Sequence, residues 1–464
     1  MKVIDPSTGE HLTNVLDDSA ELIAEKVAAA RAAQPSWAAR PVGERIEIMR
    51  AFRGWIVKKT DELAALLTSE TGKPITQSRN ELAGLLPRID FFLDEAVATL
   101  ADEVVLDDAD AAGGGRLREV ITHEPLGVIA NISAWNYPYF VGSNVFVPAL
   151  LAGNAVLYKP SEHATLTGLA IASMLNDAGV PVDVFSLVAG DGVVGAELLA
   201  HPLDGVFFTG SYATGRRIAE SVASHLGRVQ LELGGKDPVY VCDDVDVAAA
   251  AEGLADGAFY NNGQSCCSVE RIYVHHSIHD AFVDRFVANV EGFVMGDPTD
   301  DATYLGPLTR ADQADVLEAQ VADAVAKGAT VRTGGARVHG GPAGTAWFAP
   351  TVLTGVTADM AVMRDESFGP IIGIQSVADD DEAVRLMNDS EYGLTAGVYA
   401  VDQARATAVL RHMRAGSAYW NCCDRVSPRL PWSGRGHSGM GSTLSTYGIL
   451  TFAHPKAWHL RTPS

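Results

Sequence analysis

The fold can be inferred from the stretch Val206-Phe207-Phe208-Thr209-Gly210-Ser211-Tyr212-Ala213-Thr214-Gly215, in which a short apolar strand turns through glycine into a helix. A glycine at such a turn allows the backbone to approach a phosphate, and the N-terminus of the following helix favours the bound anion. The spacing differs from Gly-x-Gly-x-x-Gly, so the usual dinucleotide fingerprint is absent and a simple helix cap is the alternative.

Short apolar segments alternate with helical segments on both sides of this stretch. The predicted strands are 127–130, 155–157, 185–188 and 206–208, and the predicted helices are 140–151, 166–176, 192–199 and 214–224. A second alternation begins near Pro238, with strands predicted at 239–241, 271–274, 371–374 and 397–399. This spacing is typical of βαβ units with buried parallel strands. The sequence therefore predicts an α/β protein with two Rossmann-like domains.

The N-terminal part of the chain is predicted to be helical. Helices are expected at 20–39, 44–70 and 78–100, with Pro41 and Gly72-Lys73-Pro74 as stops. Ala111-Ala112-Gly113-Gly114-Gly115 is a predicted turn between two stretches of alternating apolar residues. The boundary between the two domains is expected near Glu232, which would leave the chemistry in a cleft between them.

The composition of the 464 residues is that of a globular protein, with 47% hydrophobic and 20% charged residues. Lys and Arg number 35 against 58 Asp and Glu, and the net charge of −23 argues against nucleic acid or an anionic membrane as the partner. The uncharged segment 139–158 is about long enough to span a membrane. Glycine, asparagine and proline interrupt it, so a buried helix, a turn and a buried strand are predicted instead.

The five cysteines are a poor disulfide framework because their number is odd and four of them form two adjacent pairs, at 266–267 and 422–423. A reducing cytoplasm is the natural expectation. The N-terminus has no apolar core of a signal peptide. No histidine or cysteine spacing suggests a metal site, and none is expected.

Two short runs supply a carboxylate and a thiol. Glu232-Leu233-Gly234-Gly235-Lys236 contains the carboxylate, and Gly263-Gln264-Ser265-Cys266 ends in the thiol. A thiolate is the reactive form of cysteine, and a nearby base can activate either the thiol or a water that attacks later. These are the parts needed to form and then hydrolyse a thioester. The alternatives are a small buried cysteine and an ordinary surface carboxylate, which the Leu and Gly-Gly flanks of Glu232 disfavour.

Lys159 and Glu162, in Tyr158-Lys159-Pro160-Ser161-Glu162, also follow a predicted strand. An ammonium and a carboxylate three residues apart can both reach a ribose diol, the lysine donating and the glutamate accepting. A solvated loop with a surface ion pair is the alternative.

The ordered set of motifs resembles the aldehyde dehydrogenase superfamily, of the NAD(P)-dependent, non-acylating type, over nearly the whole chain. Besides the Lys159, Gly210, Glu232 and Cys266 runs, the resemblance rests on Pro125-Leu126-Gly127, Trp135-Asn136-Tyr137-Pro138, Glu366-Ser367-Phe368-Gly369-Pro370 and Pro431-Trp432-Ser433-Gly434.

The resemblance implies that the chain binds NAD, with NADP possible. Lys159 and Glu162 match the residues that hold the adenosine ribose, and Glu162 would repel a 2′-phosphate. Glu366 and Phe368 match the carboxylate at the nicotinamide ribose and its aromatic neighbour. The other cofactor-binding residues implied are Trp135, Gly192, Thr209, Gly210, Ser211, Gly215 and Leu233.

The resemblance also implies the catalytic roles. Cys266 would attack the aldehyde, and the side-chain amide of Asn136 with the backbone N–H of Cys266 would stabilise the oxyanion. Hydride transfer would leave a thioester, which water activated by Glu232 would hydrolyse to a carboxylate. The family places its nucleophile two residues after Gln264, which selects Cys266 over Cys267. Cys267 is expected to be a partly exposed neighbour.

By resemblance, residues 1–102 and 124–235 form the NAD-binding domain and residues 236–443 the catalytic domain. Residues 103–123 and 444–464 form an oligomerisation arm, so a homo-oligomer is expected, either a dimer or a tetramer. A CoA-acylating relative and a non-enzymatic binding or structural protein on the same scaffold are the alternatives. CoA-acylating relatives generally lack a carboxylate at the position of Glu232, and a non-enzymatic protein would have lost the catalytic residues.

The aldehyde substrate is less defined. Family pockets are shaped by residues near Tyr139, Phe140, Trp420 and Asp424, and the loop 421–425 lines the substrate entrance. Aromatic residues at 135, 137 and 420 favour apolar, aromatic or cationic aldehydes. No arginine cluster is evident for a dicarboxylic semialdehyde, although Arg425 and Arg429 leave that substrate open.

Overall fold

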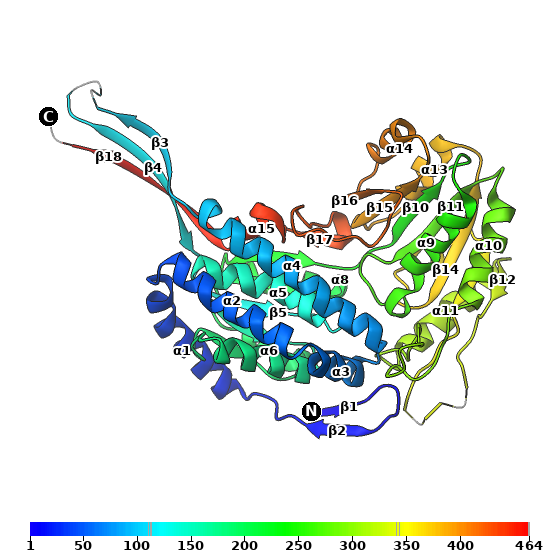
Figure 1. Cartoon of the computed structure of the whole chain (residues 1–464), viewed down its shortest axis with the longest axis horizontal. Coiled ribbons are helices and arrows are strands. Elements are labelled where there is room, and N and C mark those ends of the chain that lie inside the picture. Colours follow the sequence, from blue (N-terminus) through cyan, green and yellow to red (C-terminus); the bar gives the residue numbers. More distant parts are fainter. Residues whose placement is uncertain (110, 112–113, 340, 343, 463–464) are drawn as a thin grey trace.

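The structure is a computed structural model that describes residues 1–109, 111, 114–339, 341–342 and 344–462. It contains two α/β units, each built on a mainly parallel sheet, and a three-stranded arm that extends away from them (Figure 1). The predicted fold class is confirmed. Residues 112 and 113 of the predicted turn lie outside the described residues.

The first unit is built on a six-stranded sheet in the order β17-β9-β8-β5-β6-β7. Its strands are β5 (Val128–Ile132), β6 (Ala155–Lys159), β7 (Phe185–Leu187), β8 (Gly205–Thr209), β9 (Arg228–Glu232) and β17 (Gly439–Met440). β5 to β9 are parallel, and β17 runs antiparallel to β9. The chain runs from β5 outward to β7 and then returns to the other side of β5 with β8. Ligands bind at such a switch point in doubly wound sheets.

Alternate residues of these strands face opposite helical layers. Ile129, Val156 and Phe207 pack in the core formed with α2 (Val42–Lys58), α4 (Ile75–Thr99), α5 (Pro138–Ala152) and α6 (Thr165–Asp177). Val128 and Val206 pack in the core formed with α1 (Ala20–Ala38), α7 (Gly192–Leu199) and α8 (Tyr212–Val222). The sheet is therefore covered on both faces.

The helix predicted at 44–70 is two helices, so this prediction is wrong at its centre. α2 ends at Lys58 and α3 (Thr60–Thr71) begins after Lys59, whose φ of −109° and ψ of 15° leave the helical region. The Thr60 hydroxyl donates to the carbonyls of Ile56 and Val57 at 2.9 and 3.2 Å. Such side-chain bonds compete with the helical backbone pattern.

The second unit is built on a seven-stranded sheet in the order β12-β13-β14-β11-β10-β15-β16, in which only β12 is antiparallel to its neighbour. Its strands are β10 (Asp237–Val241), β11 (Val269–His275), β12 (Thr330–Thr333), β13 (Thr351–Thr354), β14 (Ile371–Val377), β15 (Thr395–Tyr399) and β16 (Ser417–Trp420). Its helices are α9 (Val247–Phe259), α10 (His279–Glu291), α11 (Gln313–Ala326), α12 (Ala361–Arg364), α13 (Asp380–Met387) and α14 (Gln403–Leu410).

The arm consists of β3 (Glu103–Asp108), β4 (Leu117–Pro125) and β18 (Ala453–Arg461), in the antiparallel order β18-β4-β3. It leaves the body of the molecule beyond α4 and α15 (Ser445–Leu450) (Figure 1). A short hairpin, β1 (Lys2–Ile4) and β2 (His11–Asn14), lies at the N-terminus.

Segment 139–158 forms most of α5, a left-handed turn at Gly153 and most of β6, as predicted. Within the described ranges, no helix has both the length and the apolar character that crossing a membrane requires.

Candidate active site

The Glu232 run connects the two sheets. β9 of the first unit ends at Glu232, and β10 of the second unit begins at Asp237. Gly234 and Gly235 lie in this crossing, where backbone and side chains approach closely. A Cβ on Gly234 would lie 2.1 Å from Oε1 of Glu366, and one on Gly235 would lie 2.7 Å from the carbonyl oxygen of Cys266. A side chain at Gly234 would displace the Glu366 carboxyl, and one at Gly235 would meet the Cys266 backbone. The Gly-Gly pair therefore allows the Glu366 and Cys266 runs to approach the Glu232 run.

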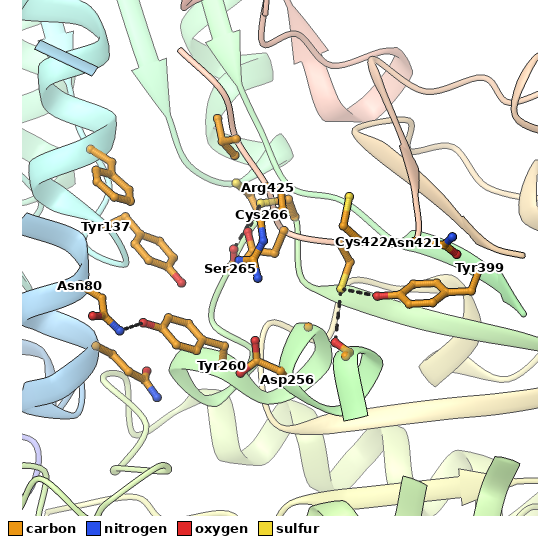
Figure 2. A pocket seen from close by; sticks show the side chains of 18 of the residues that line it. Asn80, Tyr137, Asp256, Tyr260, Ser265, Cys266, Tyr399, Asn421, Cys422 and Arg425 are labelled. Carbon is orange, nitrogen blue, oxygen red and sulfur yellow. Dashed lines mark hydrogen bonds between the residues drawn. The ribbon is translucent and has the colours of Figure 1, made fainter. Parts of the chain in front are cut away.

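A cavity of about 850 Å³ lies where the two units face each other. Its wall combines residues of α4 and α5 with residues of α9, of the 3-10 helix Tyr260–Gly263 and of the loop after β16 (Figure 2). Cys266 is on this wall. The loop residues 421–425 also line the cavity, as expected.

The two adjacent cysteines differ in their surroundings. Cys266 is half-buried, whereas the side chain of Cys267 is buried and its Sγ donates to Oδ1 of Asp424 at 2.9 Å. The bond to the Cys266 side chain and burial raise the pKa of Cys267 well above its usual value. The expectation that Cys267 is partly exposed is wrong, because its side chain packs into the core of the first unit.

Asn136 is buried beside the loop that carries Cys266. Its amide nitrogen donates to the carbonyl oxygen of Gln264 at 3.1 Å. The amide nitrogen of Asn261 donates to the carbonyl oxygens of Asn136 and Gln264, at 3.3 and 3.2 Å. Asn261 has a positive φ of 52°, as part of a tight turn before the cysteine. The Asn136 amide keeps one N–H for a further acceptor.

The Glu232 carboxyl is buried. Oε1 accepts hydrogen bonds from Nε2 of Gln230 and from Oγ1 of Thr443, each at 2.7 Å. Oε2 is buried without a hydrogen-bond partner in the described part of the chain. Burial raises the pKa of Glu232 to about 7, and the bonds from Thr443 and Gln230 oppose this effect. No hydrogen bond joins Glu232 to Cys266 within the described residues, and Glu232 is not among the residues that line the cavity.

Glu366 approaches the same crossing from the second unit. Its Oε1 accepts from the backbone N–H of Gly235 at 3.1 Å. Burial, and then the neighbouring Glu270, raise the pKa of Glu366 to about 8. Glu270 itself is held by Lys236 and by the backbone N–H groups of Ser367 and Phe368. Lys236 therefore anchors the loop that carries Glu366.

Phe368 has a positive φ of 47°, and its ring lies 5.6 Å from the Trp135 ring in an edge arrangement. Trp135 in turn meets His163 edge-on at 6.3 Å, just after the Lys159 run. Trp135 and Phe368, expected at the cofactor from different parts of the sequence, are therefore in contact.

Lys159 ends β6 and is buried, 3% exposed. Its ammonium donates to the carbonyl oxygen of Pro160 at 3.2 Å, and it has no salt bridge among the described residues. Burial lowers its pKa, and the nearby Glu162 opposes this. The Glu162 carboxylate accepts from the Ser161 hydroxyl at 3.2 Å. A buried ammonium with free N–H groups beside a carboxylate can bind a diol.

The turn after β8 has the predicted form. Ser211 caps α8 by accepting from the N–H of Thr214 at 3.4 Å. The Gly210 N–H donates to the carbonyl oxygen of Glu232 at 3.0 Å, so Thr209 and Gly210 lie beside the Glu232 run. A Cβ on Gly215 would meet Cδ2 of Leu233 at 2.6 Å. Gly215 thus allows α8 to pack on Leu233.

Gly192, the first residue of α7, lies apart from these contacts. A Cβ there would have no atom within 4 Å, so packing does not require glycine. Gly190, two residues before, has a φ of 150° and packs tightly on Val194. The turn before α7 therefore requires a glycine at 190.

The expected aromatic channel is confirmed at Tyr137 but not at Trp135 or Trp420, which do not line the cavity. Tyr139 itself is 1% exposed and donates its hydroxyl to the carbonyl oxygen of Leu63, although its neighbours Tyr137 and Phe140 line the cavity. Trp420 donates to the carbonyl oxygen of Ala400 and does not line the cavity. Phe140 and Asp424 do line it, as expected.

The sequence prediction missed several residues of the cavity wall. They include Arg88, Glu81, Asp256, Tyr260 and Trp432. Figure 2 shows Tyr137 and Tyr260 on the α4 side of Cys266, with the Tyr260 hydroxyl bonded to Asn80 at 3.1 Å. The Pro431-Trp432 motif was noticed as part of the resemblance, whereas α4 gave no signal that its residues would face a site.

Comparison with known proteins identifies the family. The sequence model described as the aldehyde dehydrogenase family matches residues 1–458. Betaine aldehyde dehydrogenase of Brucella anthropi is 36% identical over 97% of this chain and 91% of its own length. A putative NADP(+) succinate-semialdehyde dehydrogenase of Mycolicibacterium smegmatis is 37% identical over 96% of this chain and 86% of its own. The crystal structure of an NAD-dependent aldehyde dehydrogenase from Sinorhizobium meliloti superposes with a TM-score of 0.95 at 32% identity, covering 100% of this chain and 92% of the other. The chain belongs to the aldehyde dehydrogenase family and is an NAD(P)-dependent aldehyde dehydrogenase.

Proposed function

We propose that this enzyme oxidises its aldehyde to a free carboxylate through a thioester on Cys266. The observation that carries the proposal is the position of Cys266, a half-buried thiol on the wall of the cavity between the two units. Cys267 is buried, and its thiol proton is engaged by Asp424. Cys422 is also a half-buried thiol on this wall, but it lies in the loop after β16, and burial raises its pKa. Cys266 lies in the loop to which Asn136 is bonded, and it is therefore the proposed nucleophile.

Attack of the Cys266 sulfur on the aldehyde carbon gives a thiohemiacetal whose oxygen becomes negative. The Asn136 amide and the backbone N–H of Cys266 are proposed as its donors. The bond from Asn136 to Gln264 fixes the amide beside the Cys266 loop while leaving one N–H for the oxyanion. Because such donors are oriented before the reaction, they stabilise developing charge at little cost in reorganisation.

Glu232 is proposed as the base that activates the hydrolytic water. A carboxylate with an ordinary pKa of ~4.3 would be a weak base, whereas one titrating near neutrality is suited to accept a proton. Burial raises the pKa of Glu232 to about 7. Its unpaired Oε2 is the oxygen that can accept from water. The carboxyl is outside the cavity wall, so its side chain must rotate towards the thioester for this step.

The cofactor site is proposed to lie along the turns after β6 and β8 and along the contact between the Glu232 run and the Glu366 loop. Lys159 and Glu162 would hold the adenosine ribose, and Glu366 the nicotinamide ribose beside Phe368 and Trp135. Gly192, Thr209, Gly210, Ser211, Gly215 and Leu233 would line the remaining path. The buried Lys159 ammonium, which has one hydrogen-bond acceptor among the described residues, supports this fit. When bound, NAD(P) supplies the acceptor for the hydride that leaves the aldehyde carbon.

The enzyme is proposed to prefer NAD to NADP. The Glu162 carboxylate lies beside Lys159, close enough to be a main influence on its pKa. A 2′-phosphate at this ribose would place a second anion against Glu162, and like charges at close range repel. Replacement of Glu162 by Gln should therefore lower the KM for NADP more than the KM for NAD.

We also propose the division of the chain into domains and its assembly. Residues 1–102 and 124–235 would form the NAD-binding domain and residues 236–443 the catalytic domain. Residues 103–123 and 444–464 would mediate a homo-oligomer, a dimer or a tetramer. The arm supports this because Val104, Val105 and Leu460 are 51, 61 and 46% exposed. Apolar side chains exposed together on one sheet are typical of protein interfaces. A cytoplasmic location is part of the same proposal.

The proposed function is tested by following NAD reduction with a panel of aldehydes, with and without coenzyme A. Reduction without coenzyme A, with release of the free acid, is expected. Reduction only in the presence of coenzyme A would identify an acyl-transferring enzyme and remove the role of Glu232. Absence of reduction with every aldehyde, in protein that still binds NAD, would favour a non-enzymatic protein.

A further inference from the structure

Two cations and two aromatic rings form a row beside the cavity. The Lys73 ammonium lies 3.8 Å from the centroid of the Tyr137 ring. The Tyr137 and Phe140 rings stack with centroids 5.8 Å apart and 6° between their planes. The guanidinium carbon of Arg88 lies 4.0 Å from the centroid of Phe140. The rings favour a cation at each end of the row. Tyr137, Phe140 and Arg88 line the cavity, whereas Lys73 does not.

The two cations differ in their counter-ions. Lys73 forms a buried salt bridge with Oε2 of Glu81. Oε1 of Glu81 accepts from the backbone N–H groups of Tyr139 and Phe140, at 2.9 and 3.4 Å. The Lys73–Glu81 pair is therefore neutral, and both oxygens of Glu81 are hydrogen-bonded. In contrast, no carboxylate of the described residues comes within 4.0 Å of the Arg88 guanidinium nitrogens.

Arg88 is also short of hydrogen-bond acceptors. Three arginines are buried in the described part of the chain, Arg45, Arg88 and Arg271, with exposures of 7, 7 and 2%. Arg45 donates four hydrogen bonds to backbone carbonyls. Arg271 donates four to backbone carbonyls and one to the Tyr273 hydroxyl. Among the residues that the structure describes, Arg88 donates a single hydrogen bond, from Nη1 to Oδ1 of Asn144 at 3.4 Å. Buried polar groups are normally paired, so the remaining donors of Arg88 need a partner within the cavity.

We propose that Arg88 binds a carboxylate of the substrate, so that the preferred aldehydes carry a carboxylate at the end remote from the aldehyde carbon. This inference rests on the proposed function, because the aldehyde must reach Cys266 on the wall of the same cavity. A guanidinium matches a carboxylate with two parallel hydrogen bonds. It also remains charged at neutrality, since burial lowers the pKa of Arg88 only to about 10.

The other charged residues of the cavity wall are either hydrogen-bonded or exposed to solvent. Asp246 accepts from the backbone N–H of Ala248 at 2.9 Å. Asp424 accepts from Sγ of Cys267 at 2.9 Å, and burial raises its pKa. Asp256 accepts from the hydroxyl of Tyr304 at 2.7 Å. Arg425 is exposed, so solvent screens its charge. A substrate carboxylate would therefore supply the counter-ion and the hydrogen-bond acceptors that the buried Arg88 guanidinium lacks.

The test compares ω-oxo acids of four, five and six carbons with the unbranched alkanals of the same lengths and with a trimethylammonio aldehyde. For the wild-type enzyme, kcat/KM should be highest for an ω-oxo acid. In Arg88→Gln, KM for that acid should rise by about 10- to 100-fold, the cost of a charged hydrogen-bonded contact. KM for the alkanal and kcat for both should change little. Arg88→Lys keeps the charge but not the planar guanidinium, so its KM for the acid should lie between those of the wild type and Arg88→Gln.

Arg79→Gln is the matched control. Arg79 is on the same helix but is exposed, bonds Asp301 and does not line the cavity. Equal changes for acid and alkanal in Arg88→Gln, or a wild-type preference for the alkanal or the cation, would overturn the proposal. If Arg88→Gln does not fold, the proposal is tested by the order of kcat/KM values of the wild-type enzyme and by the KM values of Arg88→Lys.

A binding measurement separates this inference from the proposed function. Calorimetric titration of Cys266→Ala with the saturated dicarboxylate of the best chain length requires no turnover. Binding that weakens by about 10-fold or more on adding Arg88→Gln supports the carboxylate site even if no aldehyde is oxidised. Binding that is absent, or unaffected by Arg88→Gln, contradicts it even if aldehydes are oxidised.

Discussion

Thr443→Val should shift the pH dependence of thioester hydrolysis upwards. The Thr443 hydroxyl donates to Oε1 of Glu232 at 2.7 Å and is the strongest single bond that holds the pKa of this carboxyl down against burial. Thr443 is 1% exposed, so water cannot easily replace the hydroxyl. Valine has nearly the same shape and lacks the donor, so the change acts on the charge of Glu232 with little repacking.

The size of the shift follows from the bond. A hydrogen bond to a charged group contributes about 1.5–3 kcal/mol, and one pKa unit corresponds to about 1.4 kcal/mol. The pKa of Glu232 should therefore rise from about 7 by at least about one unit. The base works unprotonated, so its active fraction at about pH 7 falls from about a half to about a tenth, and hydrolysis slows about fivefold. The rate should recover as the pH rises past the new pKa.

The assay is single-turnover hydrolysis of the acyl-enzyme as a function of pH. Thr443→Ser is the control, since it keeps the hydroxyl and should leave the midpoint near that of the wild type. A Thr443→Val profile with an unchanged midpoint would refute the assignment of Glu232 as the base. A rate that stays low at every pH would show that the substitution acts through structure instead.

Three further outcomes follow from the geometry. Cys267→Ala should keep turnover within about threefold of the wild type, a change below ~1 kcal/mol, because its side chain is 4% exposed and its thiol is bonded to Asp424. NAD reduction measures this, and loss of activity would contradict the choice of nucleophile. Glu81→Gln should lower the free energy of unfolding by about 3–5 kcal/mol, because it leaves the Lys73 ammonium buried without its partner. Urea denaturation measures this, and Glu81→Gln combined with Lys73→Met should lose less stability than Glu81→Gln alone. Gly234→Ala should raise the KM for NAD by about tenfold or more, a loss of at least ~1.4 kcal/mol of binding, because the new Cβ would lie 2.1 Å from Oε1 of Glu366. Steady-state kinetics measure it against Gly54→Ala, where a Cβ has nothing within 4 Å.

The core strands could be predicted because their residues are buried on both faces and therefore form continuous apolar runs. β6 and β8 are examples, with nearly every side chain buried. β16 was missed because it lies at a sheet edge and alternates between half-buried and exposed residues over only four positions. The break at Lys59 was missed because Thr60 ends the helix through a local side-chain bond that periodicity does not record.

The chemistry-bearing residues could be named from local runs, but the cavity wall could not. α5 is buried on nearly all sides, so its sequence has no polar face to show whether Tyr139 or Phe140 meets the cavity. Arg88 has its partners, Phe140 and Asn144, on a different helix more than 50 residues away. Its isolation from carboxylates is a tertiary property that no sequence window contains.

The claim that a Cys266 thioester is hydrolysed by water that Glu232 activates can be tested directly by mass spectrometry of Glu232→Gln. The variant is mixed with NAD and a good aldehyde substrate, and peptides are mapped after rapid acid quench. We expect one acyl group on Cys266 and a burst of about one equivalent of reduced cofactor, because the thioester forms but is not hydrolysed. Free turnover without an adduct, or an acyl group on Cys267, would contradict the account.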